Sequence, residues 1–284
     1  MKKILKKSAA ALAALTLTAA LAGCGSSASS AAASTDTAAS TAETSDENEL
    51  EKVKAAGKLV IGVEGTYPPF TYHDDSGELT GLDIELGKAL AEKLGVEAEF
   101  QEAAWDSLLI GIDSGRFDTV INSVSITDER AEKYDFSTPY AFNRTAVITK
   151  ADDDSINTLE DLKGKKTANT ISSTYAELAE QYGAAVTGVD DLNQTFELLL
   201  SGRIDATLNA EMTFYDYTKE HPDANVKIAV LTDDANQIAI PMRKGDETAA
   251  LRTAIDAAID ELRADGTLKA LSEKYFGRDI STEE

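Results

Sequence analysis

The sequence predicts an α/β fold built from two related lobes, and two features of the chain lead to this prediction. From about residue 50 onward, short apolar segments with strand character alternate with helical patterns. Strands separated by helices of about 10–15 residues indicate βαβ units and a mostly parallel sheet. In addition, the segment Ser-Gly-Arg-Phe-Asp at 114–118 recurs almost unchanged as Ser-Gly-Arg-Ile-Asp at 201–205. Glycine favours such helix-to-strand turns anywhere, but the similar patterns around both copies favour two lobes of one kind.

The predicted elements follow in order along the chain. An apolar segment at 59–63 is typical of a strand buried on both faces of a sheet. Leucines at 82, 86, 90 and 94 recur every four residues and stop at Gly95, which predicts a helix with a glycine C-cap. Further strands are predicted at 118–121, 146–149, 166–169, 205–208 and 226–231, and further helices at 175–182, 247–264 and 267–275.

The N-terminal segment indicates export. Four lysines at positions 2, 3, 6 and 7 precede an apolar stretch at 9–22, which is the layout of a signal peptide over residues 1–23. The tetrapeptide Leu-Ala-Gly-Cys at 21–24 resembles the lipobox of bacterial lipoproteins, which implies that Cys24 is lipidated and anchors the protein without crossing the membrane. The alternative is an ordinary signal peptide cut after Gly23. Residues 24–49 are rich in Ser, Ala and Thr and predict a flexible linker, so the folded part begins near Leu50.

Charge and composition exclude several classes of protein. The formal net charge is −23, and removal of residues 1–23 takes away four lysines, which gives −23 − 4 = −27. A chain this acidic repels polyanions, so we expect no nucleic-acid partner. Cys24 is the single cysteine, so no disulfide and no catalytic thiol are expected. The sequence has no His-x-x-x-His or nucleophile motif, and we expect no metal, no cofactor and no catalytic residues.

Polar and aromatic side chains follow the predicted strands, where open α/β sheets bind their ligands. Together they have the composition of a cleft for a polar small molecule. Arg130 has the geometry to clamp a carboxylate, although it could also be a surface arginine paired with Glu129 or Glu132. The hydroxyls at 172–174 could do no more than start a helix, through a capping box of Thr174 and Glu177. The candidates are Glu64, Tyr67, Phe70, Trp105, Asn122, Ser123, Ser125, Arg130, Ser172, Ser173, Thr174, Asn209 and Glu211.

Several motifs stand in one order along the chain. They are Tyr-Pro-Pro-Phe at 67–70, Gly-Leu-Asp-Ile-Glu-Leu at 81–86, Trp-Asp-Ser-Leu at 105–108, Ser-Ile-Thr at 125–127 before Glu-Arg at 129–130, and Tyr-Asp-Phe-Ser-Thr-Pro-Tyr at 134–140. This series, within residues 50–278, resembles the family 3 extracellular solute-binding proteins, which are amino-acid receptors of ABC importers. The segments 64–67, 71–74, 205–209 and 215–217 are most similar to the cystine-binding branch.

The resemblance implies a two-lobed clamshell of the type II periplasmic-binding-protein kind. Lobe 1 would comprise 50–145 plus 240–284 and lobe 2 would comprise 146–239, with hinge strands near 145–148 and 237–240. The ligand α-carboxylate would meet Arg130, Ser125 and the start of the helix at 172–174. Tyr67 and Trp105 would sandwich the ligand, and Asn122 and Ser123 would offer polar contacts.

One position departs from the family pattern. Many members carry an aspartate for the ligand's α-ammonium where this chain has Ala210. Glu211 or the carbonyl of Ser123 is the expected substitute. A carboxylate at Glu64 would suit the distal ammonium of cystine, or the side chain of lysine or arginine.

The resulting functional prediction is a binding component of an ABC importer that captures an amino acid by closing its lobes and delivers it to a membrane permease. Cystine is the first choice of ligand, and a cationic or polar amino acid (Arg, Lys, His or Gln) is the second. A dehydratase-type enzyme on the same fold, with Glu64 and Glu211 as an acid pair, is a remote alternative, and a sensory role through a separate partner also stays open. We expect a monomer outside the cytoplasm, anchored through Cys24. The linker favours a Gram-positive surface, although Gram-negative lipoproteins share the lipobox.

Overall fold

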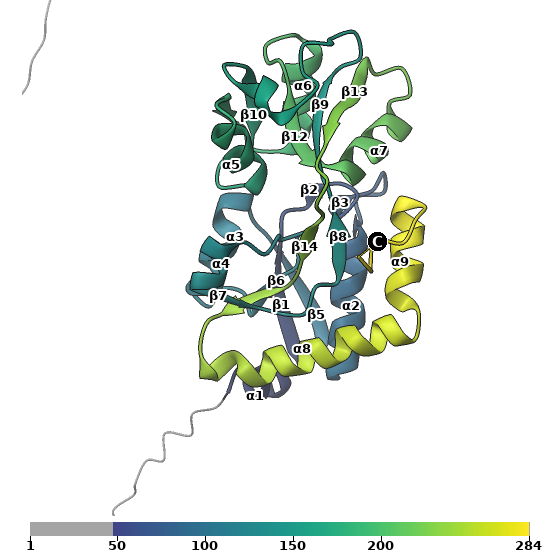
Figure 1. Cartoon of the computed structure of the whole chain (residues 1–284). Helices are drawn as coiled ribbons and strands as arrows, with labels where there is room; N and C mark the ends of the chain where they lie inside the picture. The colour runs from purple at the N-terminus through teal and green to yellow at the C-terminus, as the bar shows by residue number, and fades with distance from the viewer. Residues whose placement is uncertain (1–47, 284) are drawn as a thin grey trace, which may run out of the picture. The chain divides into compact units, whose positions relative to one another are not determined.

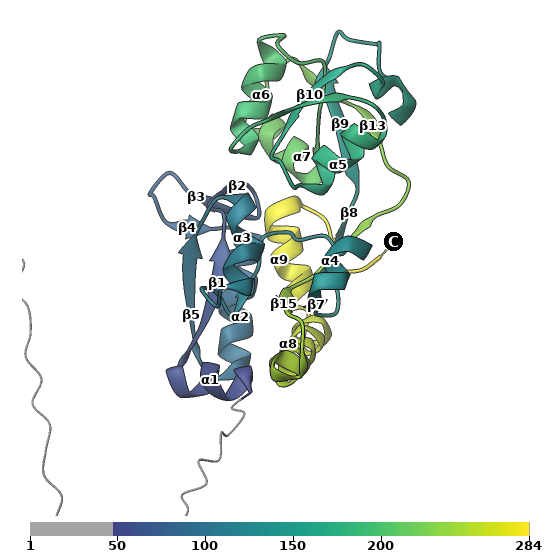
Figure 2. The same cartoon turned by 90° about the vertical axis from the view of Figure 1, so that its left-hand side faces the viewer.

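The computed structural model describes residues 48–283, which all belong to one compact unit. The predicted signal peptide, the lipidation site Cys24 and most of the predicted linker lie outside these residues. Within residues 48–283 the elements gather into two lobes (Figures 1 and 2). This arrangement confirms the predicted α/β fold with two lobes. No helix in this part of the chain has the length and apolar character needed to cross a membrane.

Lobe 1 contains a parallel sheet in the order β5-β1-β6. The central strand β1 pairs with both neighbours, so that Ile61 lies opposite Phe100 on one side and Thr119 on the other. The strands are β1 (Lys58–Val63), β5 (Glu97–Glu102) and β6 (Thr119–Val120), and a small antiparallel sheet is formed by β2 (Thr66–Tyr67), β3 (Thr71–His73) and β4 (Leu79–Thr80). The helices are α1 (Glu49–Ala56), α2 (Leu82–Leu94), α3 (Trp105–Asp113), α4 (Asp128–Lys133), α8 (Asp246–Ala264) and α9 (Thr267–Phe276).

The helices α2, α8 and α9 of lobe 1 form where the sequence predicts them. On α2, the side chains of Leu82, Leu86 and Leu90 are buried, and Gly95 ends the helix in the left-handed conformation with φ 76°. The C-terminal helices α8 and α9 pack on α2, which lies early in the chain. Lobe 1 is therefore completed by residues from both ends of the folded chain (Figure 2).

Lobe 2 combines parallel and antiparallel pairing. The central strand β9 pairs antiparallel with β12 and β13, whereas β10 and β11 pair in parallel. The antiparallel pairing arises because β9 enters the lobe directly from the connecting strands, without a βαβ crossover. The strands are β9 (Thr145–Lys150), β10 (Lys166–Asn169), β11 (Ala185–Gly188), β12 (Thr207–Ala210) and β13 (Val226–Leu231), and the helices are η1 (Leu159–Leu162), α5 (Thr174–Gln181), α6 (Leu192–Leu200) and α7 (Glu211–Glu220).

One antiparallel pair of strands lies where the chain passes between the lobes, and a second pair lies within lobe 1 (Figures 1 and 2). Strand β8 (Ala141–Asn143) pairs with β14 (Asn236–Ile238), and β7 (Tyr134–Phe136) pairs with β15 (Pro241–Arg243). The strands that connect the lobes are therefore β8 and β14. Of the two segments expected as hinge strands, 237–240 begins in β14, whereas 145–148 lies in β9 of lobe 2.

The repeated segment has the same structural role in both lobes. In lobe 1, the carboxylate of Asp118 accepts a hydrogen bond from the main-chain N–H of Val60 at 2.7 Å. In lobe 2, Asp205 accepts one from the N–H of Lys166 at 2.8 Å. In each case an aspartate that follows a helix-ending glycine holds the beginning of a parallel strand. The sequence repeat therefore corresponds to a repeated structural unit.

Candidate functional site

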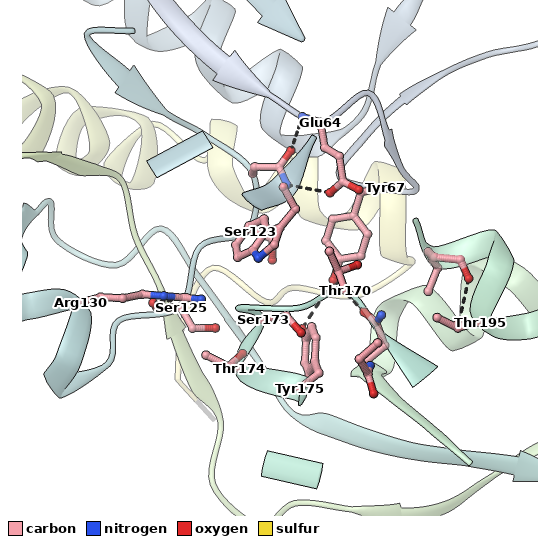
Figure 3. A pocket seen from close by; sticks show the side chains of 15 residues that line it. Glu64, Tyr67, Ser123, Ser125, Arg130, Thr170, Ser173, Thr174, Tyr175 and Thr195 are labelled. Carbon is pink, nitrogen blue, oxygen red and sulfur yellow. Dashed lines mark hydrogen bonds between the residues drawn. The ribbon is translucent and has the colours of Figure 1, made fainter. Parts of the chain in front are cut away.

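A pocket lies between the two lobes, at the carboxyl ends of the parallel strands (Figure 3). Strand β1 ends just before Glu64, β6 ends just before the loop that carries Asn122 and Ser123, and β10 ends at Asn169. Lobe 1 lines the pocket with Glu64, Tyr67, Trp105, Asn122, Ser123, Ser125 and Arg130, and lobe 2 lines it with Asn169, Thr170, Ser173, Thr174, Tyr175, Leu192, Thr195 and Asn209. Among these lining residues, the charged side chains are Glu64 and Arg130.

Glu64 is held in place by neighbouring polar groups. Its main-chain N–H donates to Asn122 Oδ1 at 2.8 Å, and the hydroxyl of Thr71 donates to the same oxygen, also at 2.8 Å. Its carboxylate accepts hydrogen bonds from Thr66 Oγ1 at 3.2 Å and from Asn122 Nδ2 at 3.4 Å. Burial raises the pKa of the Glu64 carboxyl to about 7, although these two hydrogen bonds lower it in part. A ligand cation in the pocket would favour the ionised carboxylate.

Arg130 is buried and faces the pocket from the opposite end. The hydroxyl of Thr127 caps helix α4 by accepting from the N–H of Arg130 at 3.2 Å. The guanidinium donates to the carbonyl oxygen of Ser125 at 3.0 Å and to that of Ser172 at 3.2 Å, and it lies 5.4 Å from the ring of Trp105. Glu129 pairs with Lys133 instead of with this arginine. The guanidinium thus has N–H groups left for a carboxylate, which it can bind in a bidentate manner.

Helix α5 brings its N-terminus to the lobe 2 side of the pocket. The hydroxyl of Ser173, and not that of Thr174, caps the helix by accepting from the N–H of Ala176 at 3.1 Å. Ser173 and Thr174 line the pocket, whereas Ser172 does not. The hydroxyl of Ser172 donates to Asp106 Oδ1 at 2.7 Å, and its carbonyl accepts from Arg130. Ser172 therefore connects the two lobes beside the pocket.

Aromatic side chains form walls of the pocket. Tyr67 donates its hydroxyl to Asn209 Oδ1 at 2.8 Å, and its oxygen lies 3.5 Å from the hydroxyl of Tyr175. Both partners belong to lobe 2, so these contacts bridge the cleft. Phe70 does not line the pocket: it is fully buried and stacks on Tyr67 with ring centroids 5.2 Å apart. Phe70 supports the wall from within lobe 1.

Glu211 lies outside the pocket, in contrast to its expected role near the ligand ammonium. Its side chain is 2% exposed. Its Oε1 lies 2.6 Å from Nη2 of Arg278 and 3.6 Å from Nε of Arg144. These two arginines bind the carboxylate on the hinge side of α7. The position after Ala210 therefore provides an ion pair of the hinge region.

Five further lining residues were not among the sequence-based candidates. Asn169 donates its amide to the carbonyl of Leu208 at 2.6 Å, and its Oδ1 is buried without a hydrogen-bond partner in the described part of the chain. Asn169 is the last residue of a strand. The expectation that ligand-binding side chains lie at the carboxyl ends of strands, which identified Asn122 and Asn209, therefore applies to Asn169 as well. Thr170 follows it directly, and Tyr175 lies in the first turn of α5. Leu192 and Thr195 lie on α6, and no signal in the sequence places that helix beside the pocket.

Comparison with known proteins agrees with this fold. The family model of the bacterial extracellular solute-binding proteins, family 3, matches residues 59–278. The L-cystine-binding protein TcyA of Bacillus subtilis is 41% identical over 230 residues, which cover 81% of this chain and 85% of that protein. An ancestral arginine-binding protein bound to arginine aligns with a TM-score of 0.73 at 39% identity, over 78% of this chain and 99% of the other. The L-cystine receptor of Neisseria gonorrhoeae in the unliganded open conformation aligns with a TM-score of 0.57 at 42% identity, over 82% and 99%.

Proposed function

Because this chain belongs to the family 3 bacterial extracellular solute-binding proteins, we propose that it is the substrate-binding component of an amino-acid ABC importer. One observation carries this proposal: a buried arginine and a half-buried glutamate line the same pocket, among otherwise neutral side chains. This arrangement is complementary to a zwitterion. Arg130 suits the α-carboxylate, and Glu64 suits an ammonium or a guanidinium.

Cystine is the first candidate for the ligand. Proteins named for cystine binding are 41% and 42% identical to this chain. Cystine carries an amino-acid group at each end, so one end can meet Arg130 while an ammonium meets Glu64. Arginine is the second candidate, because structures of proteins bound to arginine align well with this chain. Its guanidinium would take the place of that ammonium at Glu64.

The ligand acts by closing the two lobes. Hydrogen bonds already connect the lobes across the cleft, from Tyr67 to Asn209 and from Ser172 to Asp106. The better alignment to the arginine-bound protein than to the open cystine receptor, at similar identity, supports a closed arrangement of this structure. A ligand that contacts both lobes stabilises this closed form by its differential affinity for the two forms. The closed form would then dock on the permease.

Enzymatic activity is not part of the proposal. An acid–base pair of Glu64 and Glu211 would be needed for the dehydratase alternative. Glu211 instead pairs with Arg278 outside the pocket. In the part of the chain that the structure describes, no group of histidine, cysteine and acidic side chains could hold a metal ion. Binding without chemistry fits these residues better than catalysis.

The proposal also includes the cellular setting. The protein would be a monomer held outside the cytoplasm by a lipid on Cys24, with the segment before residue 48 as its tether. The support is the lipobox-like tetrapeptide at 21–24. Labelling with a radioactive fatty acid tests the anchor, since a Cys24→Ser variant should lose both the label and the membrane association.

Ligand identity is tested by thermal unfolding of residues 45–284, which form the compact unit, after bound ligand is removed by unfolding and refolding. A ligand at 100 times its Kd should add about 2.7 kcal/mol to the free energy of unfolding, which raises Tm by roughly 5–11 °C. A shift with cystine alone supports the first candidate, and a shift with arginine, lysine or glutamine supports the second. No shift with any amino acid would contradict the proposal.

A further inference from the structure

Asp83 is a buried acid that lies behind the pocket and takes no part in the contacts described above. Its side chain has no exposed surface. Oδ2 accepts a hydrogen bond from the main-chain N–H of Ser123 at 2.6 Å, and Oδ1 accepts one from the hydroxyl of Tyr140 at 2.8 Å. Asp83 belongs to the first turn of α2, so a rigid helix of lobe 1 sets its position. The acid therefore contacts the pocket loop directly.

Ser123 needs such a partner because of its backbone conformation. It has φ 50°, in the left-handed region that residues other than glycine rarely adopt. Its hydroxyl oxygen is buried without a hydrogen-bond partner in the described part of the chain, and the residue lines the pocket (Figure 3). The residue with the strained backbone thus carries, beside the pocket, a hydroxyl that has no partner among the described residues. Strain of this kind persists only where the surroundings hold the residue in place.

The loop around Ser123 is also tied to the hinge. The carbonyl of Val124 accepts from the N–H of Ala239 at 3.0 Å, and the N–H of Ile126 donates to the carbonyl of Gln237 at 2.9 Å. Both partners lie in or next to the hinge strand β14. These bonds hold the residues after Ser123, whereas the N–H of Ser123 itself is bonded to Asp83. Among the main-chain groups of this loop, the N–H of Ser123 is therefore the one that the Asp83 carboxylate holds.

We propose that Asp83 is a positioning residue of the binding site, which holds Ser123 in its left-handed conformation so that the serine hydroxyl faces the ligand. This role rests on the proposed amino-acid binding. It differs from a purely structural role because loss of Asp83 would weaken ligand binding through Ser123, beyond any loss of stability.

The test compares variants of the compact unit 45–284, with L-cystine and L-arginine as probes. Asp83→Ser removes the acceptor, whereas Asp83→Asn keeps an oxygen that can accept from the N–H of Ser123. Asp118→Ser is the matched control, because Asp118 also accepts a main-chain N–H, at 2.7 Å, but at the other end of β1. Affinity is measured by calorimetry, and amide hydrogen exchange of the segment 122–126 is measured without ligand.

We expect Asp83→Ser to weaken binding about tenfold or more and to speed exchange in 122–126 by a similar factor, because a main-chain N–H loses a charged acceptor. Asp83→Asn should stay close to wild type in both measurements. Asp118→Ser should lower Tm but leave the ligand affinity and the hydrogen exchange of 122–126 unchanged. In the Ser123→Ala background, Asp83→Ser should weaken binding less than threefold, because the hydroxyl it positions is gone.

The proposal is overturned if Asp83→Ser lowers Tm without changing the affinity or the hydrogen exchange of 122–126. It is also overturned if Asp83→Ser weakens binding as much in the Ser123→Ala background as in the wild type. If the wild-type protein binds neither probe, cystine and arginine are both excluded as ligands, while the exchange measurement still decides whether Asp83 holds Ser123 in place. If Asp83→Ser does not fold, Tyr140→Phe replaces it. That variant keeps the bond to Ser123, so a tenfold faster exchange in 122–126 would then contradict the proposal.

Discussion

The pH dependence of ligand binding should report directly on Glu64. Burial raises the pKa of this carboxyl to about 7 in the free protein. A ligand ammonium or guanidinium requires the ionised carboxylate, so binding of such a ligand must release the proton. The affinity should therefore increase as the pH rises toward 7 and then level off.

The magnitude follows from the fraction of ionised Glu64. With a pKa of about 7, roughly 3% of the carboxyl is ionised at pH 5.5 and roughly 76% at pH 7.5. The affinity should thus rise about 25-fold between these pH values, which corresponds to about 2 kcal/mol. Glu64→Gln should bind more weakly at pH 7.5 and show no dependence on pH.

Trp105 provides the assay, since it is the single tryptophan of the chain and lines the pocket. Its fluorescence should change when a ligand binds, and titrations at several pH values then give the affinity. Glu102→Gln is the matched control, because Glu102 lies in the same lobe and contacts His73 outside the pocket. This variant should keep the pH dependence of the wild type. A wild-type affinity that stays constant from pH 5.5 to 7.5, or a Glu64→Gln variant that keeps the dependence, would refute this reasoning.

Three other outcomes are expected. Arg130→Lys should weaken binding roughly 100-fold in the same fluorescence titration, because an ammonium cannot form the bidentate pair with a carboxylate; a loss below threefold would count against the carboxylate clamp. Glu211→Gln should lower the free energy of unfolding, measured in urea, by about 1–2 kcal/mol. The loss is smaller than for a fully buried ion pair because Arg278 is 39% exposed. The control is Lys269→Ala at an exposed position, which should lower the same free energy by under about 0.5 kcal/mol. Burial raises the pKa of Asp83 from 3.8 to about 7, so the folded state keeps a proton that the unfolded state releases. The free energy of unfolding should therefore fall by about 2–3 kcal/mol from pH 5 to 7.5. Urea unfolding of Asp83→Asn should lack this contribution, and a variant with the same pH dependence as the wild type would contradict the raised pKa of Asp83.

Most of the site was predictable because it follows one topological rule. Glu64, Asn122 and Asn209 were expected at strand ends, and the structure places all three in the pocket. The rule works because β1 and β6 run in parallel, as do the chains that meet at the bridge from Thr167 to Ala206, so that each pair ends at the same edge of its lobe. The roles of these residues toward a ligand remain predictions.

The positions that the sequence did not reveal depend on tertiary packing. Glu211 directly follows a strand like the others, but it faces Arg278, which is 67 positions later in the chain and has no local signature. Leu192 and Thr195 reach the pocket only because of how α6 packs. Strand β5 was also not predicted, since its alternating acidic residues suit an edge strand and lack an apolar run.

The placement of α8 and α9 has a consequence for biosynthesis. Lobe 2 is formed by one continuous stretch of chain, so all its strands are synthesised before the last two helices. Lobe 1 cannot complete its folding until α8 and α9 have been made, because α2 packs on these two C-terminal helices. The N-terminal half thus carries uncovered apolar leucines until synthesis is nearly complete. A truncation that removes α9 would leave lobe 1 open and prone to aggregation, whereas lobe 2 would keep all of its own strands.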